Sequence, residues 1–234
     1  MDLKTSILKF HARYHYPQWV FSRKITAYLN ENNNPQLAKK FLDAPCGAGE
    51  VSHQLSKSFA KSTILGCDLS GEAISWARAN FGHKDNLTFV EANVFDVLQS
   101  KPDFFDVICI VNSLFLLPKI DELMRLLHQS LNANGELILI IPNKDADSFL
   151  NFHSKHPSVN TFVVNLGQLE NYLEHQNFKV VSKREALKIN LNPYAWVNKL
   201  SLFKDFFLIA YNWYTERFAK NHVPAYYMVV AKKQ

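Results

Sequence analysis

The sequence FLDAPCGAGE, residues 41–50, carries a short apolar run into a turn of small residues and then into a helical pattern. The glycines at positions 47 and 49 allow the backbone to turn sharply and to approach a ligand that a Cβ would exclude. Asp43 closes the apolar run and directs a carboxylate toward this turn. In an open α/β sheet the ligand crevice lies at the carboxyl ends of the strands. The segment therefore predicts a strand, a ligand-binding turn and a helix.

Short apolar runs alternate with helical patterns from residue 39 onward, which predicts an α/β fold with a parallel sheet. The expected strands, rich in β-branched or large apolar residues, are Lys40–Ala44, Thr63–Cys67, Leu87–Glu91, Phe105–Val111, Glu136–Ile141, Phe178–Ser182 and Tyr226–Ala231. Helices are expected at Glu50–Phe59, Gly71–Phe81, Ile120–Leu131 and Gln168–His175. Residues 132–135, Asn-Ala-Asn-Gly, are expected to end a helix with a left-handed turn before the fifth strand.

The charge pattern and the cysteines exclude some classes of partner. Basic residues outnumber acidic ones by 26 to 21, but they are scattered singly or in pairs. A nucleic-acid footprint would cluster them, so no nucleic-acid partner is expected. The three cysteines lack paired metal spacing, so no metal site is expected. Since the chain shows neither a signal peptide nor the ~20 apolar residues of a membrane span, we expect a cytoplasmic location.

A second carboxylate, Asp68, follows the second expected strand about 20 residues after the glycine turn, where it can accept hydrogen bonds from both hydroxyls of a ribose. Ser70 can cap the next helix. The run GAGEVS, residues 47–52, also nearly matches the dinucleotide fingerprint of nicotinamide enzymes, with Ser52 in place of the third glycine. Both Asp43 and Asp68 could instead serve only as loop caps, a common role of aspartates at strand ends.

Residues 39–143 resemble the class I S-adenosylmethionine-dependent methyltransferases, whose first motif is an acidic residue followed by a glycine-rich turn. Pro45 stands where that family more often has its first glycine. The resemblance implies a Rossmann-like, seven-stranded, mostly parallel sheet with the last strand antiparallel and helices on both faces. It also implies S-adenosylmethionine as cofactor and S-adenosylhomocysteine as product.

The resemblance further implies which residues meet the cofactor. Asp43 organises the site around the methionine part, Asp68 binds the ribose, and Asn93 meets the adenine amino group. The full set of implied contacts is Asp43, Ala44, Gly47, Gly49, Asp68, Leu69, Asn93, Val94, Val111 and Asn112. Leu116 occupies a position where many relatives carry a histidine, which removes one common group on the substrate side. Asn93 could equally be ordinary turn chemistry.

We expect one domain over residues 1–234, since this length supports one large core and is short for two catalytic domains. Residues 1–38 are predicted to form an N-terminal helical cap, residues 39–143 the cofactor-binding core, and residues 191–222 a helical insertion before the last strand. Apolar residues at three- and four-residue spacing define two faces of the insertion. It is expected to be core, a substrate lid, a subunit interface or a peripheral membrane contact.

The expected acceptor is a small apolar or aromatic molecule or a lipid, because the insertion is aromatic and no basic tract is present. Tyr14, Phe207 and Tyr211 are its candidate contacts. No catalytic residue is assigned; His11, His15 and His153 are candidate general bases, since imidazole titrates near neutral pH.

Two other function classes remain open from the residues. One is a nicotinamide-dinucleotide-dependent oxidoreductase, which the near-match at residues 47–52 would serve. The other is a non-catalytic partner subunit that binds S-adenosylmethionine without transferring its methyl group. Methyl transfer to an acceptor separates the methyltransferase from both.

Overall fold

The computed structural model describes residues 3–146, 165–188, 210, 214 and 223–234, with side chains from Gln18 onward. The described helices are α1 (Leu3–Asn32), α2 (Glu50–Ser58), α3 (Gly71–Phe81), α4 (Val94–Gln99), α5 (Ile120–Ser130) and α7 (Leu166–His175). A short 3-10 helix, η1, covers Leu114–Leu116. The strands are β1 (Lys40–Asp43), β2 (Thr63–Asp68), β3 (Leu87–Glu91), β4 (Phe105–Val111), β5 (Leu131–Pro142), β6 (Phe178–Leu187) and β7 (Tyr226–Lys233).

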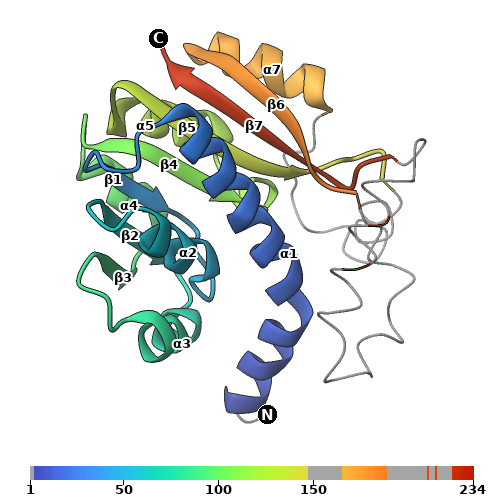
Figure 1. Ribbon diagram of the computed structural model, residues 1–234. Coiled ribbons are helices and arrows are strands. Elements are labelled where there is room, and N and C mark those ends of the chain that lie inside the picture. Colours follow the sequence, from blue (N-terminus) through green and yellow to red (C-terminus); the bar gives the residue numbers. More distant parts are fainter. Residues whose placement is uncertain (1–2, 147–164, 189–209, 211–213, 215–222) are drawn as a thin grey trace.

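The described strands form one seven-stranded sheet in the order β3-β2-β1-β4-β5-β7-β6 (Figure 1). The pairings from β3 through β5 are parallel. The last strand, β7, is antiparallel to both β5 and β6, between which it lies. The predicted mostly parallel sheet with an antiparallel last strand is therefore confirmed.

Helices cover both faces of the sheet, and each face has its own apolar core. On one face α1, α2 and α3 pack against the strands, and on the other α4, α5 and α7 do so. Alternate residues of β5 supply both cores, because successive side chains of a strand point to opposite faces. Ile138 and Ile140 join the first core, whereas Leu137 and Leu139 join the second. Strands buried on both faces explain the near-continuous apolar runs in the sequence.

The C-terminal half of α1 is part of the first apolar core. Phe21, Ile25 and Leu29 are fully buried, and α1 contacts α2, α3 and β6. The predicted N-terminal cap is thus, from about residue 18 onward, an integral layer of the sandwich. Figure 1 shows α1 running diagonally across the face that α2 also covers.

A buried carboxylate anchors α1 to the sheet. Glu136 of β5 accepts hydrogen bonds from Tyr28 Oη at 3.4 Å and Asn33 Nδ2 at 3.3 Å, and lies 3.5 Å from Lys232 Nζ. Burial, followed by the interaction with Glu136, raises the pKa of Tyr28 to about 12. A buried charge is stable in a fold when it is paired and hydrogen-bonded. The network therefore holds the end of α1 against β5 and β7.

Several predicted boundaries were wrong. Helix α5 ends at Ser130 and β5 begins at Leu131, five residues before the predicted start. Leu131 pairs with Phe105, and pairing resumes only at Glu136 and Val107, so residues 132–135 form an irregularity within the strand. Asn134 does have a positive φ of 71°, but inside β5 and not at a helix end. Helix α4 was missed because six residues are too few to show a helical period.

Candidate functional site

The predicted cofactor residues gather at the carboxyl edge of the parallel strands. From β1 the chain proceeds to β2 and β3 on one side and then crosses to β4 on the other side. The strand order thus reverses between β1 and β4, which is where ligands bind in open α/β sheets. The strands end here in Asp43, Asp68, Glu91 and Val111.

Asp43 lies in the middle of this edge and is almost completely buried. Its register partners are Gly66 in β2 and Cys109 in β4, and its exposed fraction is 1%. Ser52 Oγ, from the first turns of α2, donates a hydrogen bond to Asp43 Oδ2 at 2.6 Å. Burial raises the pKa of Asp43 to about 7, although the hydrogen bonds from Ser52 act to lower it. The carboxyl group can therefore change its charge near neutral pH.

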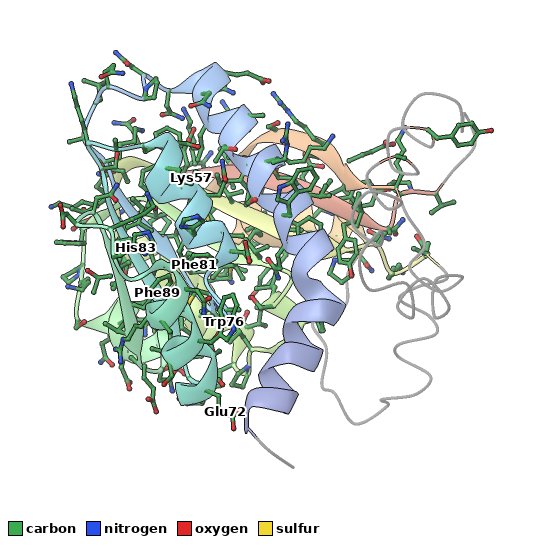
Figure 2. The ribbon with its side chains drawn as sticks, turned by 60° about the horizontal axis from the view of Figure 1, so that its bottom comes forward. Lys57, Glu72, Trp76, Phe81, His83 and Phe89 are labelled. Carbon is green, nitrogen blue, oxygen red and sulfur yellow. The ribbon has the colours of Figure 1, made fainter. Side chains whose placement is uncertain are left out.

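The turn between β1 and α2 uses two left-handed residues, Gly47 at φ 52° and Gly49 at φ 81°. The N–H of Gly49 donates to Cys46 O at 3.0 Å, and Gly49 is the N-cap residue of α2. A Cβ on Gly49 would lie 2.6 Å from the ring of Phe89 and 3.1 Å from the Cβ of Ala77. Figure 2 shows Phe89 on the side of the sheet that α2 and α3 cover. The left-handed backbone and the close packing of Phe89 and Ala77 therefore both require glycine at position 49, and its approach to the cofactor stays a prediction.

Asp68 joins the glycine turn to the start of α3. Its Oδ2 accepts the N–H of Gly47 at 2.7 Å and its Oδ1 accepts the N–H of Ser70 at 2.9 Å. Ser70 caps α3 as predicted, since its Oγ accepts the N–H of Ala73 at 3.3 Å. Leu69 is 73% exposed beside the carboxylate. Each carboxylate oxygen can accept more than one hydrogen bond, so Asp68 keeps acceptor capacity for two hydroxyl groups.

Asn93 and Val94, the predicted cofactor contacts at the end of β3, also have a role in the fold. Asn93 is exposed and caps α4, because its Oδ1 accepts the N–H of Phe95 at 3.0 Å. Val94 is buried in the second apolar core. The N–H of Ala92 donates to Asp68 O at 3.0 Å, which ties the ends of β3 and β2 together. The capping role of Asn93 is thus present, and its contact with adenine stays a prediction.

The end of β4 contains a residue that the sequence analysis missed. Val111 is buried, and Asn112 has a φ of 51° and donates its N–H to Ile140 O at 2.8 Å. Ser113, which follows, is 6% exposed, and its Oγ has no hydrogen-bond partner among the described residues. A buried hydroxyl without a partner is rare and calls for an explanation, such as a ligand. Leu116, on η1, is 55% exposed.

The remaining predicted site residues lie outside what the structure describes. The side chains of His11, Tyr14 and His15 precede the first described side chain, and His153, Phe207 and Tyr211 fall in ranges that are not described. Their predicted roles in catalysis and acceptor binding stay predictions. Among the described helices none is long and apolar enough to cross a membrane.

Asp106, near the start of β4, has a structural role. Its Oδ2 accepts the N–H of Lys40 at 2.6 Å, and its Oδ1 accepts a hydrogen bond from Asn132 Nδ2. These bonds lie at the amino ends of β1 and β4, opposite the site. Within the described ranges, no group of three or more His, Cys, Asp or Glu side chains is placed to hold a metal ion.

Comparison with known families identifies the class of protein. Residues 36–177 match the model of a methyltransferase domain family, and the chain belongs to that family. The chain is 28% identical over 150 residues to a malonyl-[acyl-carrier protein] O-methyltransferase of Halalkalibacterium halodurans, a match that covers 63% of this chain and 52% of the relative. It is 30% identical over 118 residues to a ubiquinone/menaquinone biosynthesis C-methyltransferase of Rhizobium rhizogenes, covering 48% and 44%. The chain thus spans about half the length of these relatives.

Solved structures with a similar fold include S-adenosylmethionine-dependent methyltransferases. One, from Archaeoglobus fulgidus, has a TM-score of 0.66 at 19% identity and covers 97% of this chain and 99% of that chain. Another, phosphoethanolamine N-methyltransferase 2 of Haemonchus contortus, was solved with S-adenosylmethionine. It has a TM-score of 0.60 at 16% identity and covers 88% and 51%. The fold is therefore that of the class I methyltransferases, which confirms the resemblance drawn from the sequence.

Proposed function

We propose that this protein binds S-adenosylmethionine at the carboxyl edge of its sheet and transfers the methyl group to a small apolar or aromatic molecule or a lipid. The observation that carries the proposal is the pair of carboxylates at the ends of adjacent strands, Asp43 and Asp68. Asp68 holds the N–H of Gly47, which lies in the turn that Asp43 begins. Family membership supports the same reaction class.

The residues present fit this cofactor. Asp68 and the exposed Leu69 offer hydrogen-bond acceptors and an apolar surface for the ribose and the adenine. Asn93 and Val94 at the end of β3 would complete the adenine side. Asp43 offers a carboxylate for the methionine part, with the Ala44–Gly47 turn beside it. The hydroxyl of Ser113, which has no partner in the part of the chain that the structure describes, is an independent sign that β4 also faces a ligand here.

When bound, S-adenosylmethionine supplies a methyl group on a positively charged sulfur, and a nucleophilic atom of the acceptor takes it. The chain's own contribution is alignment and exclusion of water, because the donor is intrinsically reactive. No general base is required where the acceptor ionises easily. This accounts for a site that contains carboxylates and a hydroxyl at the strand ends and no described catalytic dyad.

An apolar acceptor is supported by an exposed leucine at the same edge of the sheet that the cofactor contacts do not use. Leu116 follows β4 and leaves a large apolar side chain open to solvent. The related proteins are named for malonyl-acyl-carrier protein and for ubiquinone and menaquinone biosynthesis. A small acceptor for the present chain is consistent with both names. The aromatic insertion, residues 191–222, is proposed to select it.

The nicotinamide alternative is disfavoured by the residue at the third fingerprint position. Ser52 is buried and hydrogen-bonded to Asp43, so this position holds a polar side chain where the dinucleotide fingerprint has a glycine for close packing of helix and strand. The non-catalytic alternative predicts cofactor binding without methyl transfer.

The decisive experiment measures both cofactor binding and methyl transfer. S-adenosylhomocysteine should bind by isothermal calorimetry, and tritium from methyl-labelled S-adenosylmethionine should appear in a fraction of cell metabolites or lipids. Binding without transfer to any fraction would support the partner-subunit alternative. A thermal shift with nicotinamide dinucleotides and none with S-adenosylhomocysteine would overturn the proposal.

A further inference from the structure

We infer that Ser52 is a positioning residue for Asp43, which it holds so that the carboxylate is presented to the methionine part of the cofactor in its charged form. This inference rests on the proposed function for the role of Asp43, but the contact between the two side chains is independent of it. Neither sequence pattern nor family membership assigns this role to Ser52.

The contact is short, buried and directed. Ser52 is fully buried, and its Oγ lies 2.6 Å from Asp43 Oδ2. A hydroxyl donating to a carboxylate at such a distance makes a charge-assisted hydrogen bond, roughly twice as strong as one between neutral groups. Ser52 of α2 therefore holds the carboxyl group through its hydroxyl, and its backbone N–H adds a second hydrogen bond.

The surroundings of Ser52 fix its hydroxyl in place. A Cβ on Gly66, the register partner of Asp43, would lie 2.8 Å from Ser52 Oγ and 2.6 Å from the Phe89 ring. A Cβ on Gly49 would meet the same ring. Phe89 fills the space that both glycines leave, and Ser52 occupies the remainder. Gly49, Gly66 and the Phe89 ring thus leave a space next to Asp43 that the hydroxyl of Ser52 fills.

No other described group that acts on Asp43 favours its charged form. Asp68 repels a charge on Asp43 and so raises its pKa. The thiols of Cys46, Cys67 and Cys109 also interact with Asp43, and burial raises the pKa of each thiol, so they are neutral at physiological pH. Within the described residues, the interactions that lower the pKa of Asp43 are hydrogen bonds from the Ser52 hydroxyl and, to a smaller extent, from the Ser52 backbone N–H. Removal of the hydroxyl should therefore raise the pKa of Asp43 and leave less of it ionised at neutral pH.

The sign of the effect on binding follows from the charges. The methionine part of the cofactor carries a cationic ammonium group, so an ionised Asp43 attracts it more than a protonated one does. In the native protein, affinity should rise as pH rises through about 7, the pKa of Asp43. Without the Ser52 hydroxyl, the same rise should occur at a higher pH.

The test uses Ser52→Ala, with Ser56→Ala as the matched control. Ser56 is also buried and lies one turn further along α2, but its Oγ donates to His53 O at 2.8 Å. Carboxyl NMR follows the titration of Asp43 without any ligand, and calorimetry measures S-adenosylhomocysteine binding between pH 6 and 8. Ser52→Ala should move the Asp43 midpoint upward by about one pH unit and weaken binding roughly fivefold at pH 7, because the ionised fraction of Asp43 falls from about one half to about one tenth. Ser56→Ala should change neither quantity.

Ser52→Cys provides a second variant with a similar side chain and a weaker donor; its Asp43 midpoint should also rise. An unchanged midpoint in both variants, or a loss of affinity of equal size at every pH, would overturn the positioning role. If the native protein binds no S-adenosylhomocysteine while the midpoint still shifts in Ser52→Ala, the proposed function fails and the contact between Ser52 and Asp43 stands.

Discussion

Gly47 donates its backbone N–H to Asp68 Oδ2 at 2.7 Å, so the turn that follows β1 is fastened to the side chain that ends β2. The same carboxylate accepts the N–H of Ser70 at the start of α3. One aspartate thereby aligns two loops at the carboxyl edge before any ligand arrives. Preorganisation of this kind reduces the entropy that binding costs.

Replacement of Asp68 by Ala should weaken binding of S-adenosylhomocysteine by at least roughly tenfold. The variant loses acceptors for the ribose, and hydrogen bonds to charged groups are worth about 1.5–3 kcal/mol each. Asp103→Ala is the control, because Asp103 is an exposed aspartate that pairs with Lys233 at 2.7 Å. Calorimetry showing equal affinity for the two variants would remove Asp68 from the site.

Replacement of Gly66 by Ala should destabilise the fold by about 1–3 kcal/mol, the usual cost of overpacking a core. The added Cβ would approach the Phe89 ring to 2.6 Å. Phe89→Leu should recover part of this loss when combined with Gly66→Ala, which a double-mutant cycle of urea unfolding measures. Gly167→Ala, where the nearest atom is Asn165 Oδ1 at 3.7 Å, serves as the tolerated control. Additive effects of Gly66→Ala and Phe89→Leu would contradict this packing.

Replacement of Asp43 by Asn should stabilise the fold at pH 8 while it weakens cofactor binding. Burial raises the pKa of Asp43 from its ordinary value of 3.8 to about 7, so the folded state holds the proton more tightly than the unfolded state. The stability contributed by this proton is present below about pH 4 and is lost as pH rises through 7, at a cost of at most about 4 kcal/mol. Asn carries no charge and can still accept the hydrogen bond from Ser52.

Thermal unfolding at pH 4 and pH 8 tests this expectation. The midpoint of Asp43→Asn should exceed that of the native protein at pH 8, and the difference should shrink at pH 4. A difference of the same size at both values would show that the charge on Asp43 is not the cause.

Replacement of Ser113 by Ala should leave thermal stability unchanged or slightly higher. Its hydroxyl is buried and has no partner within the described ranges, so the variant loses no hydrogen bond there and removes an unsatisfied polar group. Binding of S-adenosylhomocysteine, or methyl transfer at saturating cofactor, should fall, and the comparison tells which ligand the hydroxyl meets. Ser130→Ala is the contrast: this buried hydroxyl donates to Leu98 O at 2.6 Å, and its loss should lower the midpoint. Full binding and full activity in Ser113→Ala would mean that the hydroxyl serves neither ligand.

The order of residues along the chain was sufficient to predict the class of fold and the two carboxylates. Apolar runs buried on both faces mark the strands, and Asp43 and Asp68 end two of them, so their shared edge follows from parallel pairing. The capping role of Ser70 could also be predicted, because a cap lies within a few residues of the groups it bonds. Boundaries such as the start of β5 could not, since they depend on pairing with β4.

Contacts between segments distant in sequence could not be predicted from the sequence and are known only from the tertiary structure. The Phe89 ring leaves no room for a Cβ at Gly49 or Gly66, and this follows only from the position of β3 beside β2 and under α2. Glu136 anchors α1 through Tyr28, which is 108 positions away in the chain. Residue spacing records local geometry, because helices and strands have fixed periods. The pKa of Asp43 depends on burial by three strands and a helix, which no period in the sequence encodes.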